Sequence, residues 1–185
     1  MPLLREIQNK KHIIWDWNGT ILNDVQHAVD TMNDLLSFHK LPSIEVEKYK
    51  TLFEFPVKNY YDKLGFNYAL RSFEDLCHDF VDNFMDGFSN CMPFQKIEET
   101  LVKVREDGRT QSVLSATDQV SLDKMIKHFN FLDHFDFVYG IDNKLAASKV
   151  GRGKELINNS QIAKDETVLI GDTIHDLEVG EELGI

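Results

Sequence analysis

Four short apolar runs, each ending in small or polar residues, constrain the fold of this chain more than any other feature. They cover residues 12–15, 111–114, 136–139 and 167–170. Brief runs rich in β-branched or aromatic residues are typical of buried strands. Apolar residues at helical spacing, such as Leu122 and Met125, lie between the last three runs. Strands that alternate with helices in this way predict an α/β fold with a doubly wound parallel sheet.

A long segment between the first two runs interrupts this alternation. Its apolar residues recur at helical spacing around Met32 and again around Phe80, and it contains eight of the thirteen phenylalanines. A single crossover helix needs far fewer residues, so the segment is expected to be an inserted helical unit with a small aromatic core. We therefore expect an α/β core formed by residues 1–22 and 93–185, and a helical cap formed by residues 23–92.

The sequence ends one helix after the fourth run, with Gly184 as a residue that can terminate that helix. Doubly wound sheets usually continue with another strand at this point, so we expect the final core strand to be absent. The fourth strand is then an exposed edge, and such edges favour pairing with other chains. A monomer or a weak homo-oligomer is the expected state.

Composition excludes several classes of partner. The formal net charge of -11 argues against a nucleic-acid-binding surface, which is usually basic. No apolar stretch approaches the roughly 20 residues that cross a bilayer, and Met1 to Lys11 lacks the apolar region of a secretory signal. Cys77 and Cys91 are the only cysteines, so we expect reduced thiols and a cytoplasmic protein without membrane partners.

Two acidic clusters follow the first and the fourth runs. Asp16 comes directly after the first run, and Asp172 and Asp176 come after the fourth. A carboxylate at a strand tip meets solvent while packing fixes the strand behind it. Because ligands of doubly wound sheets bind beyond the carboxyl ends of the strands, these carboxylates are expected to meet there. Together they indicate one divalent-metal site for phosphate chemistry.

The order of these motifs resembles that of the haloacid dehalogenase superfamily. The motifs are Asp16-x-Asn18-Gly19-Thr20, a later strand that ends in Ser115, a downstream Lys149, and Gly171-Asp172-x-x-x-Asp176. The chain looks most like the phosphoglycolate-phosphatase-like branch, which carries a helical cap after the first motif. The resemblance extends from about His12 to Ile185 and implies a Rossmann-like core and a phosphatase acting on a small phosphorylated metabolite.

The resemblance also implies the metal ligands and the nucleophile. Asp16 would take the phosphoryl group as an aspartyl phosphate. Asp16 and Asp172, with the backbone carbonyl of Asn18, would hold Mg²⁺, and Asp176 would act as a further ligand or through a water.

A second group of residues would bind the phosphate. Ser115 would donate a hydrogen bond to a phosphoryl oxygen, assisted by the backbone N–H of Ala116. Lys149 would offset the negative charges of nucleophile and phosphate, with Lys144 and Lys154 as nearby alternatives.

Asn18 departs from the pattern of the superfamily, whose phosphatases usually carry a second aspartate at this position. That aspartate protonates the leaving oxygen and then activates water, and an asparagine can do neither. General acid–base catalysis contributes about 10²–10⁴-fold, so hydrolysis is expected to be slowed by that order. The alternatives are a weakly catalytic or non-catalytic regulatory protein that binds a phosphorylated ligand, and a phosphotransferase to an acceptor other than water.

The two tryptophans beside the nucleophile are expected to differ in environment. Strand alternation sends Trp15 and Trp17 to opposite faces. We expect Trp15 in the core and Trp17 at the entrance of the site.

Overall fold

The computed structural model describes residues 7–145 and 148–185, so the first six residues of the expected core segment lie outside the described part. Its centre is a four-stranded sheet in the order β5-β4-β1-β6, in which all pairs are parallel. The strands are β1 (His12–Trp15), β4 (Thr110–Asp118), β5 (Phe137–Ile141) and β6 (Thr167–Ile170). The predicted α/β fold with a doubly wound parallel sheet is confirmed.

Two strands differ from their predicted bounds. β4 continues past Leu114 to Asp118, with a shift of register between these two residues in its pairing with β5. β5 begins one residue later than expected and ends at Ile141. The extension carries Ser115 and the residues after it along the edge of the sheet where β1 ends.

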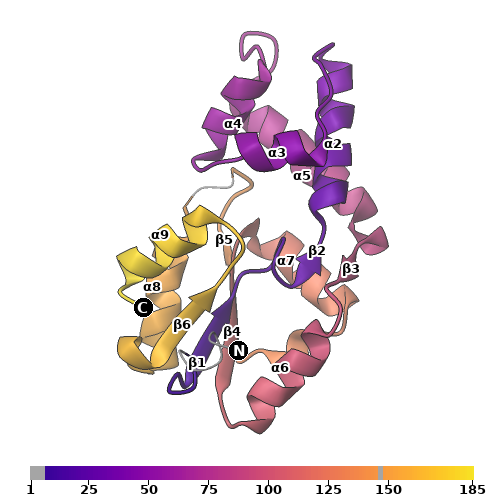
Figure 1. Ribbon diagram of the computed structural model, residues 1–185. Coiled ribbons are helices and arrows are strands. Elements are labelled where there is room, and N and C mark those ends of the chain that lie inside the picture. Colours follow the sequence, from indigo (N-terminus) through magenta and orange to yellow (C-terminus); the bar gives the residue numbers. More distant parts are fainter. Residues whose placement is uncertain (1–6, 146–147) are drawn as a thin grey trace.

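Helices cover both faces of the sheet (Figure 1). α6 (Ile97–Glu106) and α7 (Gln119–His128) pack on one face, and α8 (Val150–Ser160) and α9 (Ile174–Leu183) pack on the other. The alternation of β1 divides the core in two, because Ile13 belongs to the first cluster of buried side chains and Ile14 to the second. Gly184 ends α9 in the left-handed conformation, as expected.

Four helices form a separate layer beyond the carboxyl ends of the strands (Figure 1). They are α2 (Val25–Phe38), α3 (Val46–Leu52), α4 (Val57–Leu64) and α5 (Phe73–Gly87). This helical layer has its own buried cluster, in which Met32, Tyr60 and Leu76 are almost fully enclosed. The predicted helical character of the inserted segment is therefore observed.

A short antiparallel pairing joins the two ends of the helical layer. β2 (Leu22–Asn23) enters the layer, a 3₁₀ turn over Phe88–Asn90 follows α5, and β3 (Met92–Pro93) leads back to the core. Leu22 pairs with Pro93 and Asn23 pairs with Met92.

β6 is an edge strand, as the sequence predicts, since it pairs only with β1 among the described residues. Two further 3₁₀ turns connect elements of the core, over Leu132–His134 and Lys164–Glu166. Within residues 7–145 and 148–185, every helix is too short or too polar to cross a membrane.

Candidate active site

The first acidic residue is fixed at the centre of the sheet edge. Asp16 directly follows β1, and its backbone N–H donates a hydrogen bond to the carbonyl of Ile170 in β6, at 2.8 Å. Only 8% of Asp16 is exposed. Because β1 lies between β4 and β6, packing on both sides holds this carboxylate in place.

Three carboxylates converge at this edge. Asp16, Asp172 and Asp176 each offer one oxygen, and these oxygens all lie within 4.8 Å of one another. Thr20 donates a hydrogen bond to Asp172 at 3.0 Å, and the hydroxyl of Thr173 donates one to Asp176 at 2.6 Å. The predicted acidic clusters are therefore brought together.

Asp176 owes its position to the start of α9. Thr173 and Asp176 form a reciprocal capping box, in which each side chain accepts a hydrogen bond from the other residue's backbone N–H. Gly171, before this turn, permits the approach, because a Cβ at that position would overlap the carboxylate of Asp176. Gly19 does the same for Asp172, and its φ of +75° lies in the left-handed region.

One lysine lies among the carboxylates. Lys149 is 2% exposed, and its Nζ lies 2.5 Å from Asp16 Oδ1 and 2.5 Å from Asp176 Oδ1. It also donates to the carbonyl of Leu114 at 3.1 Å. The two alternative lysines lie elsewhere, since Lys144 pairs with an exposed aspartate of the helical layer and Lys154 pairs with a glutamate of α9.

Burial and mutual repulsion perturb these charges. Burial, followed by the charges of Asp176 and Asp172, raises the pKa of Asp16 to about 7, although Lys149 opposes the rise. Partial burial also raises the pKa of Asp172, against the hydrogen bond from Thr20. Burial works against ionisation of Asp176, but Lys149 and the Thr173 bonds outweigh it and lower its pKa.

Lys149 remains a cation in this setting. Burial opposes its charge, but Asp16 and Asp176 outweigh that effect and raise its pKa. Among residues 7–145 and 148–185, three carboxylates therefore face a single cation. An excess of oxygen donors and negative charge in one place is the chemistry that a hard divalent cation requires, so the residues fit a metal site.

Ser115 and Ala116 lie at the same edge of the sheet. Val113 of β4 is level with Trp15 of β1, so Ser115 follows just beyond the position level with Asp16. Ser115 is 1% exposed, and its hydroxyl accepts a hydrogen bond from the backbone N–H of Thr117 at 3.1 Å. Its phosphate-binding role stays a prediction.

Asn18 contacts two residues that the sequence analysis did not identify. Its Nδ2 donates to Asp24 Oδ2 at 2.5 Å, and its Oδ1 accepts from the hydroxyl of Thr117 at 2.7 Å. Asp24 also accepts from the backbone N–H of Gly19 at 2.9 Å and is 4% exposed. Burial raises the pKa of Asp24, and the hydrogen bonds from Asn18 and Gly19 oppose the rise.

Asp24 directs its side chain away from the helix that follows it. It directly precedes α2, where an aspartate is typical of a helix cap, but its side chain makes no capping hydrogen bond. The carboxylate instead turns back toward the loop after Asp16. Contact across these residues cannot be derived from spacing alone.

The prediction that Trp17 lines the entrance is wrong. Trp17 is fully buried, and its ring contacts those of Phe129 and Phe131. Strand alternation no longer applies, because β1 ends at Trp15 and the chain turns there. Trp15 is buried as expected, in the same cluster.

His175 connects the acidic cluster to the helical layer. Its ring stacks on Phe55, with centroids 4.0 Å apart, and its Nδ1 lies 3.4 Å from Glu178. A hollow beside this stack is lined by Phe55 and Pro56 from the helical layer, by Ser148, and by residues of α8 and α9. It therefore lies where the helical layer meets the start of α9, the helix that carries Asp176.

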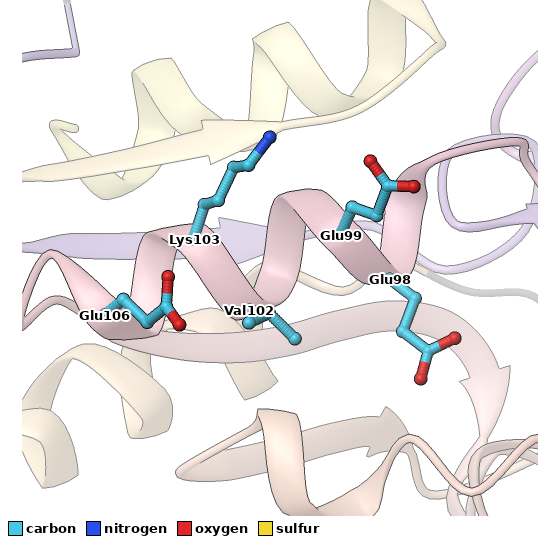
Figure 2. Close-up of a pocket in the computed structure, with 5 residues that line it drawn as sticks. All are labelled: Glu98, Glu99, Val102, Lys103 and Glu106. Atoms are coloured by element: carbon cyan, nitrogen blue, oxygen red, sulfur yellow. The ribbon is translucent and has the colours of Figure 1, made fainter.

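Another hollow lies on the outer surface of α6 (Figure 2). All five labelled side chains come from that one helix: Glu98, Glu99, Val102, Lys103 and Glu106. Figure 1 shows α6 at the end of the core away from the helical layer. Since no second element of the described structure contributes groups to this hollow, it offers no convergent site.

Comparisons with known proteins agree with this arrangement. A family model described as haloacid dehalogenase-like hydrolase matches residues 13–185. None of the curated protein sequences matches this one significantly.

Several solved structures share the fold. A haloacid dehalogenase-like family hydrolase from Streptococcus pneumoniae is 17% identical, with a TM-score of 0.82 over 96% of this chain and 83% of that one. A protein assigned as a phosphoglycolate phosphatase from Lactobacillus plantarum is 11% identical, with a TM-score of 0.83 over 95% and 84%. A predicted phosphatase from Clostridium acetobutylicum is 16% identical, with a TM-score of 0.81 over 95% and 82%. At these identities the likeness concerns the fold alone.

Proposed function

This chain belongs to the haloacid dehalogenase-like hydrolase family, and from that premise we propose that it is a Mg²⁺-dependent phosphatase of small phosphomonoesters. The observation that carries the proposal is the cluster formed by Asp16, Asp172 and Asp176 around the Nζ of Lys149. A buried lysine beside a strand-end carboxylate offers a means of bringing a phosphate against an anionic nucleophile.

Asp16 is the nucleophile in this mechanism. Its carboxylate oxygen forms a bond to phosphorus as the bond from phosphorus to the alcohol oxygen breaks, which leaves an acyl phosphate on Asp16. The leaving oxygen takes a proton from solvent water, because Asn18 cannot supply one, and departs as the alcohol. Water then attacks this phosphorus and gives up a proton to solvent, the bond from phosphorus to the Asp16 oxygen breaks, and inorganic phosphate leaves the free carboxylate. Lys149 lowers the repulsion between Asp16 and the incoming phosphate in both steps.

Asp16, Asp172 and the backbone carbonyl of Asn18 would hold Mg²⁺, with Asp176 as a further ligand. When bound, the cation supplies charge stabilisation for the phosphoryl oxygens. This assignment is supported by the oxygen donors within 4.8 Å of one another and by the raised pKa values of Asp16 and Asp172.

Ser115 and the backbone N–H of Ala116 bind the phosphoryl oxygens, because fixed donors aimed at developing charge stabilise transfer. Residues 1–22 and 93–185 form the catalytic core, and residues 23–92 form a cap that excludes water and selects the alcohol. The contact of Phe55 with His175 supports a cap that reaches the site. The net charge of -11 favours a small metabolite over a nucleic acid as substrate.

The test is Mg²⁺-dependent release of phosphate from a panel of phosphomonoesters that includes phosphoglycolate. Activity should disappear in Asp16→Asn and on chelation of the metal. Asp30→Asn, which removes an exposed carboxylate on α2, is the matched control and should retain the activity. Release that survives in Asp16→Asn would refute the proposal.

Both ends of the Asn18 amide are occupied by hydrogen bonds, and this observation favours a second candidate function. The chain would then transfer the phosphoryl group to an acceptor other than water, or act as a regulatory protein that hydrolyses its phosphorylated ligand slowly. A chain of this kind would accumulate phosphorylated Asp16. Incubation with a labelled aryl phosphate followed by acid quenching should then trap close to one labelled phosphoryl group per protein, and a phosphatase with fast water attack should trap little.

A further inference from the structure

The amide of Asn18 is held at both ends. Asp24 accepts from its Nδ2 at 2.5 Å, and Thr117 donates to its Oδ1 at 2.7 Å. The second oxygen of Asp24 accepts from the backbone N–H of Gly19 at 2.9 Å. Since Asp24 is 4% exposed, water has little access to replace these bonds.

These three hydrogen bonds require a particular pairing of donors and acceptors. Residue 18 must donate to residue 24, accept from Thr117, and leave residue 24 free to accept from Gly19. An amide at 18 with a carboxylate at 24 satisfies all three. A carboxylate at both positions places two acceptors against each other. An amide at both positions keeps these contacts only if the Asn18 amide flips, so that residue 24 donates to its Oδ1 and its Nδ2 donates to the Thr117 hydroxyl.

The reverse pairing satisfies the same bonds. With Asp at 18 and Asn at 24, the amide of residue 24 donates to residue 18 and its oxygen still accepts from Gly19. Either oxygen of the carboxylate at 18 can still accept from Thr117. The structure therefore accommodates one carboxylate across these positions, at either place, and disfavours two.

We propose that Asp24 is a positioning residue whose carboxylate disfavours a carboxylate at position 18, so that an amide stands there. The carboxyl that would otherwise lie at position 18, beside the reacting phosphate, is at position 24 instead. Asp24 keeps the loop after Asp16 in place through Gly19 and holds the Asn18 amide in a fixed orientation. The catalytic part of this inference rests on the proposed function, and the structural part does not.

The first test is a double-mutant cycle measured by thermal unfolding without metal. N18D should lower Tm by roughly 5–10 °C, because a partly buried charge loses its donor. D24N should lower Tm less than N18D, because a flipped Asn18 amide can still satisfy the contacts with residue 24 and Thr117. The combined variant N18D/D24N should return to within about 3 °C of the parent, a non-additivity that marks direct coupling.

An exposed amide–carboxylate pair on α2 provides the matched control. Gln26 Nε2 donates to Asp30 at 2.8 Å, and both side chains of this pair lie at the surface. Gln26→Glu creates the same opposition of two carboxylates in solvent, and Tm should change by no more than about 2 °C.

The second test compares benzyl phosphate with phenyl phosphate as substrates. Benzyl alcohol is a poor leaving group that depends on protonation, and phenol depends on it much less. N18D/D24N should increase phosphate release from benzyl phosphate by about 10²-fold, with a much smaller gain for phenyl phosphate. N18D alone should not reach this gain, since its new carboxyl opposes Asp24.

The outcomes separate the two proposals. An N18D chain as stable as the parent, or a swapped chain no more stable than N18D, would overturn the role of Asp24 even if every form releases phosphate. Coupled Tm values in chains that release no phosphate from any ester would support the positioning role and refute the phosphatase.

Discussion

Replacing Asp16, the proposed nucleophile, should stabilise the metal-free protein at neutral and alkaline pH. Burial and the neighbouring carboxylates raise the pKa of Asp16 to about 7, whereas its ordinary value is 3.8. The native state therefore disfavours the ionised form of this side chain. Asp16→Asn removes the charge and nearly keeps the shape, so the free energy of unfolding should increase wherever Asp16 would be ionised.

The sign and size follow from proton linkage. Well below pH 3.8 the Asp16 carboxyl is protonated in both the native and the unfolded state, so its titration does not change the free energy of unfolding. As pH rises toward 7, the unfolded chain releases its proton first, so the native state loses stability, and the loss is complete above pH 7. The separation of the two pKa values corresponds to about 4 kcal/mol as an upper limit. The free energy of unfolding of Asp16→Asn, relative to that of the parent, should therefore increase by about 2–3 kcal/mol between pH 5 and pH 8.

Urea unfolding in EDTA at pH 5 and pH 8 measures this difference. Asp30→Asn serves as the control, because its exposed carboxylate on α2 should give no gain that grows with pH. Adding Mg²⁺ should stabilise the parent more than Asp16→Asn, since in the proposed site Asp16 would bind the cation in the native state. If Asp16→Asn proves equally stable as the parent at pH 8 without metal, the argument from charge crowding fails.

Three further changes test other contacts. Lys149→Met should lower the free energy of unfolding by about 3–5 kcal/mol in EDTA and abolish phosphate release, because it strands two buried carboxylates, while Lys154→Met should do neither. Burial lowers the pKa of His12 to about 4, so the native state disfavours the protonated ring. As pH falls from 6.5 to 4, the free energy of unfolding of the parent, measured in urea, should therefore decrease by up to about 3 kcal/mol relative to that of His12→Gln. Gly171→Ala should weaken Mg²⁺ binding measured by calorimetry, because its Cβ overlaps a site carboxylate, whereas Gly151→Ala, at an open position in α8, should stabilise by about 0.5–1 kcal/mol.

The fold could be predicted because apolar runs and helical stripes record burial directly. β1 and β6 have the bounds that their apolar residues indicate, and β6 lies at the edge as expected. The bounds of β4 could not be derived in this way, because its extension to Asp118 consists of small and polar residues. Backbone pairing continues there without an apolar pattern to reveal it.

The candidate site was predictable only where residues follow strand ends. Asp16 and Asp172 meet because parallel strands end at one edge. Lys149 depends on where α8 begins, and the residues around it resemble any surface segment, so motif order alone singled it out. Asp24 and Thr117 reach Asn18 through tertiary contacts that leave no local signal.

The pairing of β2 with β3 has a mechanical consequence. The chain enters and leaves the helical layer at adjacent points, Asn23 and Met92. Changes in a few backbone dihedral angles there would therefore rotate the whole layer as a rigid body relative to the core. Asp24 directly follows Asn23, and its carboxylate accepts hydrogen bonds from Asn18 and Gly19 in the loop after β1. A rotation of the layer about this pairing would therefore act on these hydrogen bonds and on the loop that follows Asp16.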